Sequence, residues 1–239
     1  MYKGLRLKPP LFEIGLKGYM YGKEALSLAR EADRLSEKYG ITVIFDPQYV
    51  DIPIISRQTK NIYVFSQHMD PFKPGRGLGG VLPEALKEAG AVGTLLNHAE
   101  KRITLSQIAR SIKRADEVGL ATLVCADSPE EAAAIAQLRP NMILAEPPDL
   151  IGAQEAVGKE FIEQTRKLVK AIDREIIIFN SAGIKTADDV KSVIRLGAEA
   201  TGSTSGILKA EDPFRIMEEM ISALKQAWEE KYPGNQQIY

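Results

Sequence analysis

Eight short apolar runs recur along this chain of 239 residues, and segments with helical periodicity separate most of them. The runs cover residues 11–16, 41–45, 62–66, 91–96, 120–125, 141–145, 175–179 and 198–204, of which the last is the weakest. Continuous apolar runs are typical of parallel strands that are covered on both faces. Eight strand–helix units without a break in composition predict one (β/α)8 barrel domain over residues 1–239. An open doubly wound sheet is the alternative, but it usually has fewer strands at this length.

The segments between the runs are amphipathic and have recognisable helix ends. They predict helices near residues 23–39, 83–89, 104–118, 129–138, 159–172, 186–196 and 213–230. Ser128 precedes Pro129 and two glutamates, which is an N-cap followed by residues that suit a first helical turn. Gly119 follows a predicted helix, where a left-handed residue is favoured. The stretch 47–58 contains two prolines and predicts a short or distorted helix.

Composition argues against several classes of protein. The formal net charge of −1 gives no attraction to nucleic acid or to an anionic membrane. No apolar run reaches the roughly 18 residues of a membrane span, and no signal-peptide core follows the basic N-terminus. The one cysteine, Cys125, cannot form an internal disulfide, and two histidines with one cysteine make a zinc site unexpected. We therefore expect a cytoplasmic protein with no nucleic-acid, membrane or metal partner.

Polar groups suited to catalysis follow three of the apolar runs. Glu146 comes directly after the run 141–145, His98 follows the run 91–96, and Lys17 follows the first run. In a parallel barrel the carboxyl ends of all strands lie on one side, so we expect these three side chains to meet there. A carboxylate there suits the role of general base. An imidazole and a fixed cation suit the negative charge of an enolate and of an anionic substrate.

Glycines and a serine follow the last three predicted strands. They are Gly152, Gly183, Ser205 and Gly206. Backbone N–H groups in the last loops of such barrels commonly bind phosphate, which makes these residues candidates for a phosphate site. The alternative is that the glycines merely turn the chain. The segment 75–80 also fits the pattern G-x-G-x-x-G, but it begins about ten residues after the preceding strand and so does not predict a dinucleotide site.

Taken together, these residues resemble the triosephosphate isomerase family in its shorter, archaeal form. The resemblance runs from about residue 11 to residue 230 and is densest in 67–71, 82–100, 145–152, 182–184 and 205–206. It implies that Glu146 is the base, His98 the neutral electrophile and Lys17 the cation near the substrate oxygens. It also implies a phosphate site at Gly152, Gly183, Ser205 and Gly206, and assigns Glu100 as the acid that follows the histidine. A homodimer or homotetramer without metal or other cofactor is further implied.

Three positions depart from the pattern of that family. Its first-strand signature, Asn-x-Lys, is here Gly15-Leu16-Lys17, so a polar donor beside the substrate is missing and Gly15 is expected to open volume there. Leu78 stands nearest to a threonine that reaches a neighbouring subunit, and Ala99 replaces a serine that holds the base. The small polar residues of 201–204 replace larger apolar ones in the last strand.

Glu13 alternates with Gly15 and Lys17, so its side chain is expected to face the barrel interior. A buried carboxylate needs a partner. The candidates that the sequence offers are Lys17, Ser203 and Thr204.

The resemblance implies an aldose–ketose isomerase that interconverts glyceraldehyde 3-phosphate and dihydroxyacetone phosphate by proton transfer through an enediolate. The small groups at Gly15 and in the last strand motivate an alternative, the same chemistry on a four-carbon ketose phosphate. The changes at Gly15, Leu78 and Ala99 motivate another alternative, a barrel that binds a sugar phosphate without turning it over.

Overall fold

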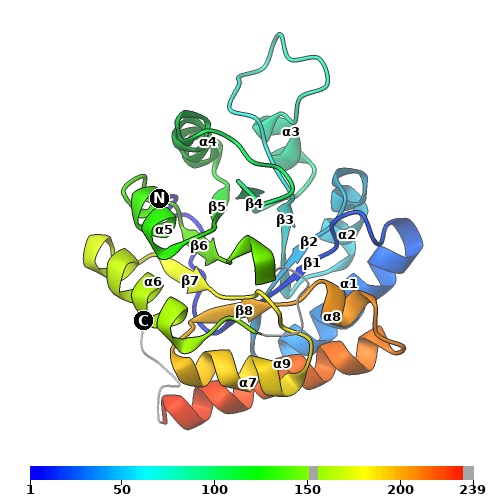
Figure 1. The fold of residues 1–239 in the computed structure, drawn as a ribbon. Coiled ribbons are helices and arrows are strands. Elements are labelled where there is room, and N and C mark those ends of the chain that lie inside the picture. Colours follow the sequence, from blue (N-terminus) through cyan, green and yellow to red (C-terminus); the bar gives the residue numbers. More distant parts are fainter. Residues whose placement is uncertain (151–155, 234–239) are drawn as a thin grey trace.

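Eight parallel strands close into a barrel in the order of the chain, from β1 to β8 and back to β1. A computed structural model describes residues 1–150 and 156–233. The strands are β1 Leu11–Gly15, β2 Thr42–Asp46, β3 Ile62–Ser66, β4 Gly93–Leu96, β5 Ala121–Ala126, β6 Met142–Ala145, β7 Ile177–Phe179 and β8 Ala200–Gly202. Helices surround the strands on the outside (Figure 1). The predicted (β/α)8 barrel is therefore confirmed.

The helices agree with the segments that the periodicity predicted. They are α1 Gly22–Tyr39, α2 Ile52–Gln58, α3 Pro83–Glu88, α4 Leu105–Val118, α5 Pro129–Ala136, α6 Lys159–Ile172, α7 Ala187–Leu196, α8 Ser205–Leu208 and α9 Pro213–Lys231, with 3-10 turns η1 Tyr49–Asp51 and η2 Pro148–Leu150. The stretch 47–58 is the η1 turn followed by the two-turn helix α2, as the two prolines indicated. The short helix α8 was not expected from the sequence. Within the described residues, none of the helices combines the length and apolar character that crossing a bilayer requires.

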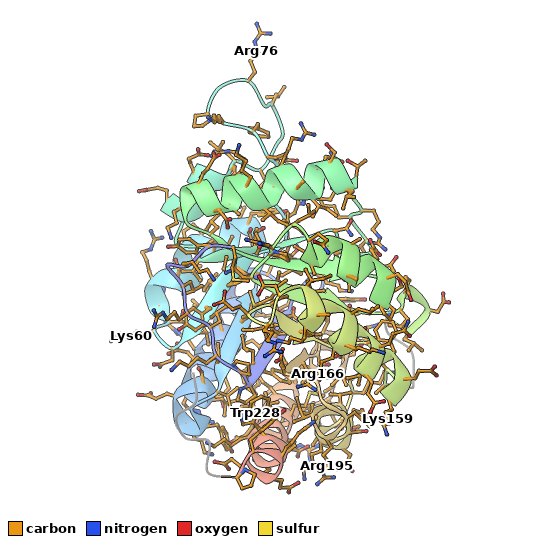
Figure 2. The ribbon with its side chains drawn as sticks, turned by 90° about the vertical axis from the view of Figure 1, so that its left-hand side faces the viewer. Lys60, Arg76, Lys159, Arg166, Arg195 and Trp228 are labelled. Carbon is orange, nitrogen blue, oxygen red and sulfur yellow. The ribbon has the colours of Figure 1, made fainter. Side chains whose placement is uncertain are left out.

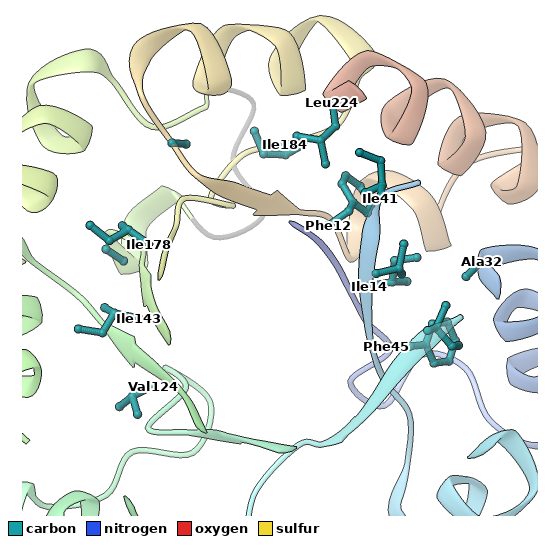
Figure 3. Packing of buried hydrophobic residues seen from close by; sticks show 14 of the residues in the cluster. Phe12, Ile14, Ala32, Ile41, Phe45, Val124, Ile143, Ile178, Ile184 and Leu224 are labelled. Atoms are coloured by element: carbon teal, nitrogen blue, oxygen red, sulfur yellow. The ribbon is translucent and has the colours of Figure 1, made fainter. Parts of the chain in front are cut away.

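Alternating side chains divide the apolar residues of the barrel into two layers. Phe12 and Ile14 of β1 point outward into a layer between strands and helices (Figure 3). Leu11 points inward, into a second layer enclosed by the strands. The inward series of β1 continues with Glu13 and Gly15, because successive side chains alternate between the two faces of a strand. Glu13 is buried there, which confirms that it faces the barrel interior.

The segment between β3 and α3 projects away from the barrel (Figure 1). Arg76 lies at its tip (Figure 2), and Leu78 is fully exposed. The glycines of residues 75–80 belong to this projection, so they do not join a strand directly to a helix N-terminus.

Candidate active site

A cavity of about 690 Å³ lies at the carboxyl ends of the strands. Its lining includes the following residues that the sequence predicted: Gly15, Lys17, His98, Glu100, Glu146, Gly183, Ser205 and Gly206. The structure thus brings the candidate base, imidazole, cation and phosphate loops around one space. The remaining predicted residue, Gly152, lies outside the described residues. We call Lys17, His98, Glu100 and Glu146 the rim of this site.

Glu146 continues β6 into the site. Its backbone N–H donates to the carbonyl oxygen of Ala126 at 2.9 Å, and the residue is 9% exposed. Burial and, to a smaller extent, the negative charge of Glu13 raise the pKa of Glu146, Lys17 partly opposes both, and the net pKa is about 7. A carboxyl group with a pKa near the working pH is well suited to accept and return a proton.

His98 is held in one tautomer. Its Nδ1 accepts a hydrogen bond from the backbone N–H of Glu100 at 3.1 Å, so the proton of the neutral ring is on Nε2. Burial and then the positive charge of Lys17 lower the pKa of His98 below its ordinary value of 6.5. At neutral pH this side chain is therefore an uncharged N–H donor at the cavity.

Lys17 follows β1 in a left-handed conformation, with φ of 48°. Its Nζ lies 2.6 Å from Oε1 of Glu100, and this contact lowers the pKa of the Glu100 carboxyl. Its carbonyl oxygen accepts hydrogen bonds from the side-chain amides of Gln48 and Gln67. These two glutamines also line the cavity, but we did not identify them as site residues from the sequence. The sequence feature that could have identified them is their position just after the apolar runs that form β2 and β3.

Asn97 is another residue that sequence reasoning missed. It is buried, and its backbone is left-handed with φ of 62°. Its Nδ2 donates to the carbonyl oxygen of Cys125 at 3.0 Å, and its Oδ1 accepts from the N–H of Ile103. Asparagine tolerates this conformation better than most residues, so Asn97 fixes the turn that presents His98. The sequence feature that could have identified Asn97 is its position directly before the candidate imidazole of His98.

The loops after β7 and β8 touch one another beside the cavity. Ser203 Oγ donates to the carbonyl oxygen of Ile184 at 2.7 Å. A Cβ on Gly206 would lie 2.6 Å from Ser203 Oγ and 2.8 Å from the Ile184 carbonyl oxygen, so a side chain there would separate the loops. The basic side chains of Lys185 and Lys209 line the same cavity, which favours an anionic group at this edge.

Glu13 has a neighbour that the sequence did not suggest. Its carboxyl group lies beside Gly15, the residue that is paired with Asp46 at the end of β2, and the charges of Asp46 and Lys17 both act on it. Ser203 donates to Ile184 instead, and no hydrogen bond joins Glu13 to Thr204 among the described residues. Of the predicted partners, Lys17 acts on Glu13 through its charge, whereas the structure does not pair Glu13 with Ser203 or Thr204 among the described residues. We call Glu13 and Asp46, which both line the cavity, the floor of the site.

The volume that Gly15 was expected to open is already occupied. A Cβ on Gly15 would lie 2.5 Å from Oε1 of Glu13, and a Cβ on Gly202 of β8 would lie 2.7 Å from Oε2. The small residues of both strands thus seat a carboxyl group rather than leave space for a larger ligand. That expectation from the sequence was wrong because the side chain two residues earlier fills the gap.

A barrel whose strand ends carry a buried carboxyl base, a neutral imidazole and a lysine around one cavity has the architecture of an isomerase of sugar phosphates. Residues 10–222 match the model of the triosephosphate isomerase family. Over 220 residues, 90% of this chain and 97% of the relative, the chain is 40% identical to a triosephosphate isomerase of Methanobacterium bryantii. A triosephosphate isomerase of Methanocaldococcus jannaschii is 39% identical over 84% of this chain and 92% of its own length. One of Saccharolobus solfataricus is 33% identical over 92% of this chain and 99% of its own length. The chain belongs to the triosephosphate isomerase family, in its archaeal branch, which confirms the resemblance seen in the sequence.

Proposed function

We propose that the protein is an aldose–ketose isomerase that interconverts glyceraldehyde 3-phosphate and dihydroxyacetone phosphate. The observation that carries the proposal is the rim, where a carboxyl group of pKa about 7 faces the same cavity as a neutral Nε2–H donor and a lysine. The names of the similar proteins support the choice of substrate.

Each rim residue has one task in this reaction. The Glu146 carboxylate takes the proton from the carbon beside the substrate carbonyl; the electron pair of that C–H bond forms a carbon–carbon double bond, and the π electrons of the carbonyl group move onto its oxygen. His98 donates from Nε2 to the oxygen that becomes negative, and the charge of Lys17 stabilises the same enediolate. Glu146 then returns its proton to the former carbonyl carbon, while the hydroxyl proton of the neighbouring carbon passes by way of Nε2 of His98 to the former carbonyl oxygen. The neighbouring carbon thereby becomes the new carbonyl, and no other reactant is needed.

The phosphate group belongs at the edge of the cavity formed by the last loops. Gly183, Ser205 and Gly206 line this edge together with Lys185 and Lys209. We assign Gly152 to the same site from its place in the chain. Lysine charges and exposed backbone N–H groups are the donors that phosphate binding requires.

Self-association is also part of the proposal. Leu78 is fully exposed on a segment that projects from the barrel, and a large apolar side chain in such a place suits contact with a second copy. Replacement of Leu78 by Asp is expected to lower the mass seen in sedimentation, and an unchanged mass would contradict this contact.

The test is a coupled assay with glyceraldehyde 3-phosphate on the wild type and on Glu146→Gln. Removal of a general base typically costs about 10²–10⁴-fold in rate, so the variant should lose nearly all turnover. Binding of dihydroxyacetone phosphate to Glu146→Gln, measured by calorimetry, should persist. If the folded wild type binds the ligand but shows no turnover, the isomerase proposal is wrong. The alternative of a barrel that binds a sugar phosphate without turning it over then remains.

A further inference from the structure

The strand register places two carboxyl side chains below the rim. Gly15 of β1 is paired with Asp46 of β2, and Glu13 is paired with Gly202 of β8. Alternate residues share a face, so Glu13 and Gly15 both point into the barrel. Each residue of a strand rises about 3.3 Å, which puts the backbone of Glu13 roughly 7 Å deeper in the barrel than that of Gly15.

Two glycines make room for the Glu13 carboxyl group. Its Oε1 lies 2.5 Å from the position of a Cβ on Gly15, and its Oε2 lies 2.7 Å from that of a Cβ on Gly202. Position 15 cannot carry a side chain while the Glu13 carboxyl group keeps its place. At position 202 the backbone carbonyl oxygen of Glu13, which lies closer still to such a Cβ, also excludes a side chain. Barrel interiors are usually filled by branched apolar side chains. Here a polar group fills the space directly beneath a reaction site, which is unfavourable unless that group has a partner.

The carboxylate oxygens of Asp46 lack hydrogen-bond donors among the described residues. Within the described part of the chain, no N–H or O–H donor reaches either carboxylate oxygen of Asp46, which is 1% exposed. Glu13 is its neighbour: Asp46 is paired with Gly15, and Oε1 of Glu13 lies 2.5 Å from the position of a Cβ on Gly15. Two carboxyl groups buried side by side do not both ionise readily, so the pair favours holding one proton. Lys17, whose charge acts on Glu13, already contacts Glu100 at 2.6 Å.

We propose that Glu13, backed by Asp46, binds the hydroxylated end of the sugar phosphate, donating the proton that the pair shares to one substrate oxygen and accepting a hydrogen bond from a substrate hydroxyl. This inference rests on the proposed function and adds to that site one substrate-contacting residue, Glu13, and one residue that positions it, Asp46. Two carboxyl groups repel an anion, whereas Lys185 and Lys209 attract one. The substrate is thus oriented with its phosphate at the edge and its hydroxyls toward the floor.

Binding of unreactive ligands separates this role from turnover. The probes are glycerol 3-phosphate, erythritol 4-phosphate, which is one carbon longer, and inorganic phosphate, each titrated by calorimetry into the wild type and Glu13→Ala. Loss of a hydrogen bond to an ionisable partner should weaken binding of at least one polyol phosphate about tenfold or more. Binding of inorganic phosphate should change by less than about threefold, because it has no hydroxylated end to reach the floor. Equal weakening of all three ligands, or of none, would overturn the proposal.

Three further variants exclude a merely structural role. Glu13→Leu fills the space without polar atoms, and it replaces Glu13→Ala if the smaller residue impairs folding. Glu13→Gln keeps the shape and an N–H donor, so it should recover most of the affinity for polyol phosphates. Glu13→Ala combined with Gly15→Asn puts an amide into the space that Oε1 vacates, and it should recover binding relative to Glu13→Ala alone. Failure of both the conservative variant and the double variant to recover any affinity counts against the proposal.

The outcome for the floor is independent of the outcome for the isomerase. A selective loss of polyol phosphate in Glu13→Ala, in a protein without turnover, would uphold the floor and reject the reaction. Turnover that depends on Glu146, combined with unchanged ligand binding in Glu13→Ala, would uphold the reaction and reject the floor. The ratio of kcat/KM for three-carbon and four-carbon sugar phosphates in the same variants then shows which chain length uses the floor contact.

Discussion

The rim and the floor of the site differ in how their charged side chains are paired. At the rim, Lys17 is paired with Glu100, and the backbone N–H of Glu100 fixes the ring of His98. At the floor, Glu13 lies beside a second carboxyl group, Asp46, and among the residues that the structure describes no lysine or arginine forms an ion pair with either. The rim therefore holds a paired cation and a neutral ring beside its base, whereas the floor consists of two carboxyl groups that favour sharing a proton.

This difference suits the rim to stabilising the reaction intermediate and the floor to binding the substrate hydroxyl groups. Charges that are fixed by neighbours are preorganised, so they can stabilise an enediolate without rearrangement as it forms. A proton shared by two carboxyl groups can be donated while the pair still accepts, which suits a hydroxyl group more than an anion. The rim thus fits the part of the substrate where charge develops, and the floor fits the part that stays neutral.

The largest effect is expected from removal of the rim cation. Lys17→Met should lower kcat by about 10²–10³-fold, because the enediolate loses a preorganised positive charge. The matched control is Lys60→Met, since Lys60 is exposed and lies outside the cavity lining (Figure 2). The measurement is kcat of both variants by steady-state kinetics. Similar kcat values for Lys17→Met and the control would show that the rim does not depend on its cation.

A pH profile of the wild type tests the base of the rim. Burial and the charge of Glu13 hold the pKa of Glu146 at about 7, and the base acts only when it is ionised. The value of kcat/KM should therefore rise with pH and level off above about 7, with a fall of about tenfold per unit at lower pH. Burial lowers the pKa of His98 below its ordinary 6.5, so protonation of this ring adds to the fall only at the acid end of the profile. A flat profile between about pH 5.5 and 8 would contradict Glu146 as the base.

Crowding of the floor should show as a loss of stability. Gly15→Ala places a Cβ 2.5 Å from Oε1 of Glu13 and should lower the free energy of unfolding by about 1–3 kcal/mol, as overpacked cores do. Gly18→Ala is the control, since a Cβ there has no atom within 4 Å. The double variant Glu13→Ala with Gly15→Ala should lose less than the two single effects combined. Denaturant unfolding measures the free energy of unfolding of Gly15→Ala, Glu13→Ala, the double variant and the control. If the loss in the double variant equals the sum of the losses in Gly15→Ala and Glu13→Ala, the steric explanation is wrong.

The sequence predicted the rim far better than the floor, for reasons that the geometry makes plain. Lys17 and Glu146 follow an apolar run directly and His98 follows one after a single residue, and the carboxyl ends of parallel strands must lie together, so local pattern sufficed. Asp46 follows the run 41–45 just as closely, but its role depends on the register that pairs it with Gly15. That Gly15 seats the Glu13 carboxyl group is a matter of side-chain direction, which spacing along the chain does not specify. The left-handed turn at Asn97 likewise depends on its hydrogen bonds to β5 and to the following loop.

The smallest effect concerns the pH dependence of stability at the floor. Burial, and then the charge of Glu13, raise the pKa of Asp46 well above its ordinary value of 3.8. The folded protein then keeps a proton that the unfolded chain has lost, so this stabilisation is complete below pH 3.8 and disappears as pH rises through the folded pKa. In Asp46→Asn that proton is absent, and the free energy of unfolding should fall less steeply with rising pH. The difference in slope is at most about 1.4 kcal/mol per pH unit for one proton.

Urea unfolding of the wild type and Asp46→Asn between about pH 5 and 8.5 measures this slope. Asp188→Asn makes the same chemical change at an exposed position and should run parallel to the wild type. Glu146 has a raised pKa in the wild type and in both variants, so its contribution should largely cancel in the comparison. If the curve of Asp46→Asn also runs parallel to that of the wild type, the floor holds no shared proton. The hydrogen bond to a substrate oxygen would then lose its donor, while the reaction at the rim would stand unchanged.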